Sequence, residues 1–171
     1  MTLVSNETGE DDSLIAAAAR GDRSAFGELY LRYARMVHGI LLARVPPADA
    51  EDLVQDVFLA AMKQLRGLRT AAAFRAWLAA IARHRAIDYF REARLSFSEA
   101  PSAAAPNQGA FAVLDLIRAL PEAYRETLIL RLVEGMTGPE IARQTGLTPE
   151  SVRVNLCRGM KMLRQTLGEK R

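Results

Sequence analysis

A basic, polar helix face near the C terminus is the part of this sequence best suited to binding a polyanion. Within the segment Thr137 to Arg164, apolar residues recur at intervals of three and four, which places them on one face of a helix. The opposite face carries Ser151, Arg153, Val154, Asn155, Arg158 and Lys161. Cations can bind phosphates while amides and hydroxyls reach base edges in the major groove. This face is predicted to bind duplex DNA, with a solvated amphipathic helix as the alternative.

The residues that precede this helix predict the first half of a helix-turn-helix. Thr137 and Glu140 have the spacing of a capping box at the start of a short helix. Gly146 permits the left-handed turn that ends that helix, and Thr148 with Pro149 suits the start of the next. This context favours DNA binding over a plain solvated helix.

An acidic, amide-bearing stripe lies in the N-terminal half. Apolar residues of this segment form one helix face that is expected in the core, namely Leu53, Val54, Val57, Phe58, Ala61, Met62 and Leu65. The other side carries Asp49, Asp52, Gln55 and Asp56. Such a stripe suits a basic protein partner, although a charged helix face is more often simply solvated.

The segment Phe74 to Arg94 combines basic and aromatic residues. Its inward residues are expected to be Phe74, Trp77, Leu78 and Ile81, and its outward cations are Arg83, Arg85, Arg91 and Arg94. Cations that follow a backbone, together with rings that hold unstacked bases, suit single-stranded DNA. Tyr89 and Phe90 fit either the core or the surface, and His84 fits either a DNA contact or a surface histidine.

No pattern in the sequence provides for catalysis or for a metal. We find no Walker motif, no metal-ligand cluster and no nucleophile with a neighbouring base, so we expect no enzyme activity and no cofactor. Cys157 is the single cysteine, which excludes an intrachain disulfide and a cysteine metal site. It could respond to redox conditions, but a plain small side chain is the favoured interpretation.

The elements that carry these residues are all predicted to be helices, because apolar residues recur at helical spacing and no alternating strand pattern is present. The expected helices cover residues 13–19, 24–44, 48–65, 72–94, 111–119, 122–134, 138–144 and 149–167. We expect an all-α fold of two small helical domains joined by a flexible linker, the second domain containing the helix-turn-helix. The expected division is an acidic flexible N terminus (1–12), a first domain (13–95), a linker (96–110) and a second domain (111–171).

Composition supports a folded protein that binds an anionic partner. Of 171 residues, 50% are hydrophobic and 25% are charged, which is typical of a folded chain. No stretch approaches the roughly 20 apolar residues of a membrane helix, so we expect a cytoplasmic protein without membrane insertion. The net charge is only +3, but acidic residues gather at the start and basic residues at the end, which favours a polyanion near the C terminus.

Motifs in a fixed order resemble the extracytoplasmic-function, or group IV, sigma factors of the sigma-70 family. They are GDRSAFGELYLRY from Gly21 to Tyr33, DLVQDVF from Asp52 to Phe58, the segment Phe74 to Asp88, and Leu120-Pro121 leading into the helix-turn-helix. The resemblance implies a sigma factor that binds core RNA polymerase, directs it to specific promoters and assists promoter melting.

The same resemblance implies roles for individual residues. The acidic stripe would dock on the β′ subunit of core polymerase. The β subunit of core polymerase is a second expected partner of the chain. Single-stranded minus-ten DNA would be bound by Arg66, Arg69, Thr70, Arg75, Arg83 and His84. Duplex minus-thirty-five DNA would be bound by Ser151, Arg153, Val154, Asn155, Cys157, Arg158 and Lys161. An anti-sigma factor is a further partner that the resemblance implies.

Two residues depart from the family pattern, and two other classes of protein remain as alternatives to a sigma factor. His84 stands where the family often has asparagine, and Asn155 stands where a basic residue is frequent, so base preference is unassigned. A helix-turn-helix regulator that binds DNA without core polymerase could use the same C-terminal motif, but it has no use for the acidic stripe. A nucleic-acid enzyme would need clustered carboxylates beside a metal, which the sequence does not offer.

Overall fold

The computed structural model describes residues 4–95 and 110–169, and these residues are helical with no strand among them. The helices are α1 (Val4–Ala19), α2 (Arg23–Leu42), α3 (Pro47–Gln64), α4 (Phe74–Leu95), α5 (Ala110–Arg118), α6 (Glu122–Leu132), α7 (Gly138–Thr145) and α8 (Pro149–Glu169). Two short 3-10 turns, Leu65–Gly67 and Ala71–Ala73, connect α3 to α4. The all-α expectation is confirmed. Each expected helix after the first begins and ends within two residues of the corresponding observed helix. The expected linker lies outside the described residues, apart from Ala110.

The first helix departs from the expectation. α1 begins at Val4 rather than at Ser13, so residues 4–12, which were expected to precede the first helix, belong to it. Asp11 is only 6% exposed, and its carboxylate accepts hydrogen bonds from Arg32, Tyr33 and Arg75. These partners lie 21 to 64 residues further along the chain, so the local sequence around Asp11 could not predict that it is buried.

A continuous core fixes the first domain, formed by α1 to α4. Leu29, Met36 and Ile40 of α2 are fully buried, as is Leu78 of α4, and they pack with the buried face of α3. Phe74, at the start of α4, stacks edge-on against Tyr33 with ring centroids 5.3 Å apart. This core sets which side chains of α3 and α4 point outward.

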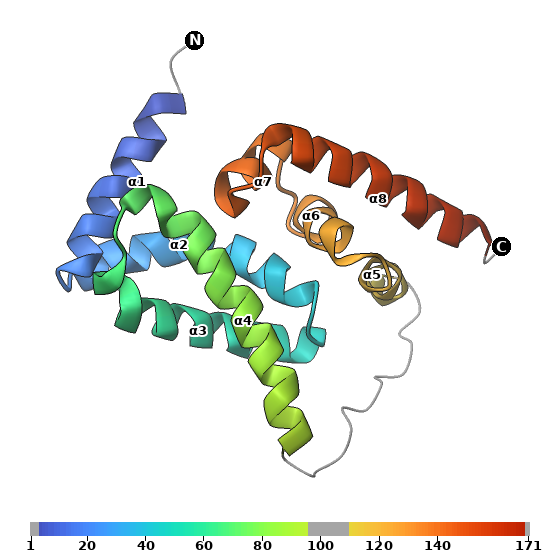
Figure 1. Cartoon of the computed structure of the whole chain (residues 1–171), viewed down its shortest axis with the longest axis horizontal. Coiled ribbons are helices and arrows are strands. Elements are labelled where there is room, and N and C mark those ends of the chain that lie inside the picture. Colours follow the sequence, from blue (N-terminus) through green and yellow to red (C-terminus); the bar gives the residue numbers. More distant parts are fainter. Residues whose placement is uncertain (1–3, 96–109, 170–171) are drawn as a thin grey trace.

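The second domain, formed by α5 to α8, packs directly against the first. In Figure 1, α6 and α7 lie beside α2 and α4, and α8 runs along the far side of α6. The first-domain core cluster continues into the second domain through Ile117, Leu128, Ile129 and Leu163. Gly39 allows α2 and α6 to approach closely, because a Cβ at this position would lie 2.6 Å from Cδ2 of Leu130. The two predicted domains are therefore in contact, which the sequence reasoning did not foresee.

Candidate nucleic-acid and polymerase interfaces

The helix-turn-helix forms with the caps that its sequence predicts. The Thr137 amide donates to Oε2 of Glu140 at 2.6 Å, and the Glu140 amide donates back to Oγ1 of Thr137, so both halves of the capping box are present. The hydrogen bonds from Thr137 lower the pKa of Glu140 below its usual range. Gly146 ends α7 at φ 76°, in the left-handed region. Thr148, the residue before α8, accepts a hydrogen bond from the Ser151 amide at 3.1 Å.

The basic face of α8 is open to solvent. Val152 and Leu163 point into the core, and the predicted DNA-binding residues that are exposed on the other side are Arg153, Val154, Cys157, Arg158 and Lys161. Ser151 and Asn155 are half-buried, and the Ser151 hydroxyl accepts a hydrogen bond from Thr148 at 2.8 Å. Ser151 therefore takes part in capping the helix, while the five exposed residues form a surface that a DNA groove can reach.

The predicted single-strand surface divides into exposed and engaged residues. Arg66, Arg69, Thr70 and His84 are exposed on the connection between α3 and α4 and on α4 itself. Arg83 instead donates to both carboxylate oxygens of Glu126 on α6, at 3.2 and 2.7 Å. Arg75 donates to Oη of Tyr33 and to Oδ2 of Asp11, each at 2.8 Å. Two of the six predicted cations or polar groups thus have intramolecular partners that the sequence did not reveal.

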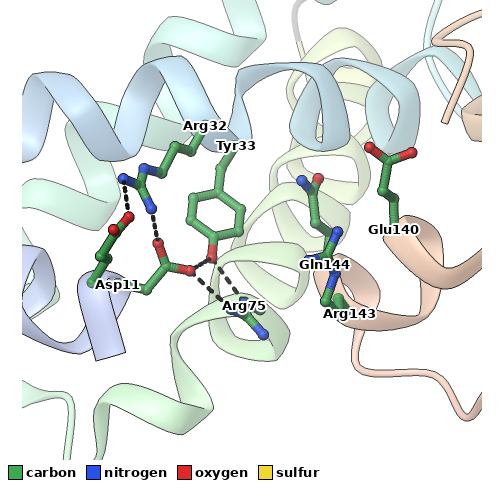
Figure 2. Close-up of a pocket in the computed structure, with 8 residues that line it drawn as sticks. Asp11, Arg32, Tyr33, Arg75, Glu140, Arg143 and Gln144 are labelled. Carbon is green, nitrogen blue, oxygen red and sulfur yellow. Dashed lines mark hydrogen bonds and ion pairs between the residues drawn. The ribbon is translucent and has the colours of Figure 1, made fainter. Parts of the chain in front are cut away.

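A hydrogen-bond network around Asp11 joins α1, α2 and α4 (Figure 2). Tyr33 donates to Oδ2 of Asp11 at 2.5 Å, and Arg32 donates to Oδ1 at 2.8 Å. Burial opposes the charged form of Asp11, but the hydrogen bonds from Tyr33, Arg75 and Arg32 outweigh it and lower the pKa of this carboxyl. Burial and the bond to Asp11 together raise the pKa of Tyr33 to about 12. Arg75 is consequently held in one orientation at the start of α4.

A polar cavity of about 290 Å³ lies between this network and α7. Figure 2 shows Glu140, Arg143 and Gln144 of α7 facing Tyr33 and Arg75 across it. Both acidic and basic side chains line the cavity, so no single charge dominates it. Its position shows that the helix-turn-helix lies next to the start of α4.

The outward face of α3 carries the acidic stripe and also an apolar extension. Asp52 and Gln55 are exposed, whereas Asp56 pairs with Arg85 at 2.6 Å and Asp49 accepts from Oη of Tyr89 at 2.8 Å. Leu59 and Met62 are 51% and 47% exposed, so the expectation that Met62 belongs to the core is wrong. The apolar positions of α3 cover more of the helix than its partners bury.

This outward face has a regular geometry that sequence reasoning missed in part. Asp52, Gln55, Leu59 and Met62 follow one another at intervals of three and four, so they lie along one side of α3. Tyr30 of α2 is also exposed, and its ring packs at a tilt of 58° against Phe58, with the ring centroids 4.7 Å apart. A partner surface that combines basic residues with an apolar patch would complement this face of α3.

Aromatic residues of α4 divide as their spacing suggested. Phe74 is buried, and Trp77 and Tyr89 are partly buried against the core. Phe90 is 41% exposed and stacks edge-on against Tyr89. Trp77 and Phe74 are therefore structural residues in this arrangement, as expected.

Neither a metal site nor a membrane helix is found in the described part of the chain. Within residues 4–95 and 110–169, no group of three or more His, Cys, Asp or Glu side chains could hold a metal ion. None of the helices in these ranges is long and apolar enough to cross a membrane.

Comparison with known proteins decides between the classes that the sequence left open. The model of Sigma-70 region 2 matches residues 29–95, and the model of Sigma-70 region 4 matches residues 110–163. The RNA polymerase sigma factor CarQ of Myxococcus xanthus is 33% identical over 161 residues, which cover 87% of this chain and 92% of CarQ. The chain belongs to the sigma-70 family. It is a sigma factor rather than a regulator that binds DNA without core polymerase.

Further relatives agree on the subgroup and on the fold of this sigma factor. The ECF sigma factor SigM of Mycobacterium tuberculosis is 29% identical, over 92% of this chain and 85% of SigM. The structure of CnrH, which is known from Cupriavidus metallidurans, was solved in complex with the cytosolic domain of CnrY. It matches with a TM-score of 0.65 and 29% identity, over 95% of this chain and 99% of CnrH. The expected membership of the extracytoplasmic-function sigma factors is confirmed.

Proposed function

We propose that this sigma factor docks on core RNA polymerase through α3 and brings two DNA-binding surfaces to a promoter. The observation that carries the proposal is the opposite character of two exposed helix faces, acidic and apolar on α3 but basic on α8. An acidic face is repelled by DNA, whereas it complements a basic protein surface. A basic helix at the end of a helix-turn-helix complements the major groove.

The α3 face is proposed to bind the β′ subunit, with contacts to the β subunit elsewhere on core polymerase. Asp52 and Gln55 supply acceptors for a basic partner, and Leu59 and Met62 supply apolar area beside them. Asp56 contributes charge although it also pairs with Arg85, because its side chain is still 46% exposed. Asp49 is turned toward Tyr89, so we assign it the smallest share of binding.

The α8 face is proposed to read duplex minus-thirty-five DNA. Arg153, Arg158 and Lys161 are exposed cations that suit phosphates or guanine edges. Val154 and Cys157 lie between them and offer small apolar contacts of the kind that suits a thymine methyl group. Ser151 and Asn155 are less accessible and are proposed to orient the helix rather than to read bases.

The connection between α3 and α4 is proposed to hold melted minus-ten DNA. Arg66, Arg69 and Thr70 are exposed there, and His84 is exposed further along α4. Unstacking a base costs on the order of a few kcal/mol, which contacts to the freed base and its backbone must offset. No nucleotide hydrolysis is needed for such trapping, and we propose that this sigma factor catalyses no reaction and uses no cofactor.

The partners follow from this role. Core polymerase is cytoplasmic in bacteria, so we propose that the sigma factor works there. CnrH is similar over nearly the whole chain and was solved with the cytosolic domain of a second protein, CnrY. We propose by this likeness that an anti-sigma factor also binds the present chain.

Run-off transcription with purified core polymerase on a pool of randomised promoters tests the proposal. Initiation from a defined subset of promoters is expected, and absence of initiation with every promoter would contradict the proposed function. Asp52→Ala and Leu59→Ala should each weaken binding to core polymerase, because each removes an exposed group of the α3 face. Glu28→Ala, an exposed acid on α2, is the matched control and should leave the affinity unchanged.

The duplex contact has its own measurement. Arg153→Ala should weaken binding to minus-thirty-five DNA and reduce the salt dependence of log K by about 1 if the side chain neutralises one phosphate. Arg23→Ala removes an exposed arginine at the start of α2 and should change neither quantity. Equal effects of the two substitutions would contradict the assignment of the α8 face.

A further inference from the structure

The cavity beside the Asp11 network is lined by equal numbers of acidic and basic side chains. These charged residues come from α1, α2, α4 and α7, and they are Glu10, Asp11, Glu140, Arg32, Arg75 and Arg143. Burial opposes the charged form of Asp11, but its hydrogen bonds lower its pKa, and the bonds from Thr137 lower the pKa of Glu140. Both acids therefore remain ionised at neutral pH, and the charges of the lining sum to zero. A wall of this kind complements a molecule that carries both signs of charge better than it complements a simple anion or cation.

Arg75 is the positive group whose orientation is best fixed. Its Nε donates to Tyr33 and its Nη2 donates to Asp11, each at 2.8 Å. These two bonds do not use Nη1, which carries two further N–H groups. The Arg75 side chain is 22% exposed, so a small molecule in the cavity can reach it. A guanidinium that is already oriented binds a carboxylate at a low entropic cost.

Gln144 presents a buried acceptor to the same cavity. Its side chain extends from α7 into the cavity (Figure 2). Its Oε1 atom is buried and accepts no hydrogen bond from any residue that the structure describes. A buried acceptor without a donor is unfavourable, because it has lost its hydrogen bonds to water. An N–H donor on a bound molecule would remove this cost.

The volume of the cavity limits the size of such a molecule. The cavity measures about 290 Å³, which at roughly 30 Å³ for each water molecule is room for about ten water-sized groups. Cavities that bind drug-sized ligands begin at about 300 Å³. This cavity therefore suits a small metabolite, and its polar lining favours a polar one.

We propose that the cavity binds a small zwitterion, namely a free α-amino acid with a polar, uncharged side chain. Its carboxylate accepts hydrogen bonds from Nη1 of Arg75, and its ammonium group donates to Oε1 of Gln144. An inorganic anion would satisfy Arg75 but not Gln144, and it would add negative charge beside Glu10 and Glu140. The inference goes beyond the proposed function and does not depend on it, because the free chain binds this ligand without polymerase or DNA.

NMR titration of the isotope-labelled full chain tests the site directly. L-Serine, L-asparagine and L-glutamine represent the ligand class. At least one of them should shift the side-chain amide signals of Gln144 in a saturable way, because its carbonyl gains a donor. N-acetyl-L-glutamine lacks the ammonium group and L-glutamine amide lacks the carboxylate, so each should bind about tenfold or more weakly than L-glutamine. Absence of saturable shifts with all three amino acids would overturn the inference, as would equal affinity for L-glutamine and its two derivatives.

Two glutamines provide a matched pair of variants. Gln144→Met removes the buried acceptor while nearly keeping the length of the side chain, and Gln165→Met makes the same change at an exposed position on α8. Gln144→Met should weaken amino-acid binding by about tenfold or more, whereas Gln165→Met should leave the affinity unchanged. Without ligand, Gln144→Met should not lower stability in urea denaturation, because no described residue donates to the oxygen that it removes. A clear loss of stability would make Gln144 a structural residue and would overturn the inference, as would unchanged affinity.

Ligand binding also predicts a change in stability of the wild-type chain. A ligand that binds only the folded protein lowers the unfolding equilibrium constant tenfold at a concentration of about nine times its Kd. Urea denaturation with and without the amino acid measures this change, and N-acetyl-L-glutamine at the same concentration controls for general solute effects. Equal stabilisation of wild type and Gln144→Met would overturn the inference. None of these measurements includes core polymerase, so a failure to initiate transcription would contradict the proposed function alone.

Discussion

Asp11→Ala is expected to destabilise the first domain more than any other substitution of an acid on α1. Its side chain is 8% exposed, and the carboxylate accepts three hydrogen bonds, from Tyr33 at 2.5 Å and from Arg32 and Arg75 at 2.8 Å. The substitution leaves Arg75 with Tyr33 as its remaining partner, because this pair is bonded directly. The start of α4 would then be held less firmly against α1.

The loss in unfolding free energy for Asp11→Ala can be estimated from the three hydrogen bonds and the exposure of each partner. A hydrogen bond to a charged group contributes about 1.5 to 3 kcal/mol, which applies to the bonds from Tyr33 and Arg75. The Arg32 side chain is 35% exposed, so its ion pair is screened and adds only about 0 to 1 kcal/mol. Because Tyr33 and Arg75 still bond each other, we expect a loss of about 3 kcal/mol in the free energy of unfolding. For a chain of this length, that corresponds to a fall in Tm of about 6 to 12 °C.

Urea denaturation at neutral pH measures this loss, with Asp12→Ala as the control because Asp12 is exposed on the same helix. Asp11→Asn keeps one acceptor and should lose about half as much. Since the pKa of Asp11 is lowered in the folded protein, its contribution is present above the unfolded pKa of about 3.9 and is lost as the pH falls through the folded pKa. If Asp11→Ala and Asp12→Ala cost the same, or if the gap persists at strongly acidic pH, the reasoning is refuted.

Three further outcomes are expected. The hydrogen bond that His38 donates to Glu134 raises the pKa of His38, so the stabilisation from this pair is full below about pH 6.5 and is lost as the pH rises through the raised pKa. The gap in unfolding free energy between wild type and His38→Gln should therefore shrink from acidic to alkaline pH, and a gap that grows would contradict this. Gly146→Ala should lose about 1 to 2 kcal/mol in urea denaturation, because φ is 76° there, and Gly168→Ala serves as its control. Thr137→Ala removes the capping box and should lose about 1 kcal/mol, and a loss near zero in thermal melting would contradict the capping role.

Local signals made much of the fold predictable. The capping residue Thr137 and the terminating Gly146 act within a few residues of the helix that they limit, so the helix-turn-helix could be placed correctly from sequence. The start of α1 could not, because the partners of Asp11 come from α2 and α4. Met62 was misplaced for a related reason, since apolar spacing marks a helix face but does not say how wide its partners are.

The sequence predicted which side chains lie on the candidate surfaces, but it did not predict which of them pair with other residues of the chain. The exposed cations of α8 were found because a helix has a fixed periodicity that separates Val152 from Arg153. The pairing of Arg83 with Glu126 depends on packing between residues 43 positions apart, which no local pattern encodes. The family resemblance implied that Arg83 contacts DNA, and only the three-dimensional arrangement showed that Arg83 is bonded to the carboxylate of Glu126.

The way in which Arg118 is anchored bears on attempts to build hybrid sigma factors. Because its acceptors are main-chain carbonyls of Leu42 and Val45, this anchor tolerates almost any side chain on the recipient α2. The notch at Gly39 has no such tolerance, since it must match the leucine that enters it. A C-terminal half grafted from another protein would keep the first attachment wherever it carries an arginine at this position, whereas the second would also require a leucine that fits the notch.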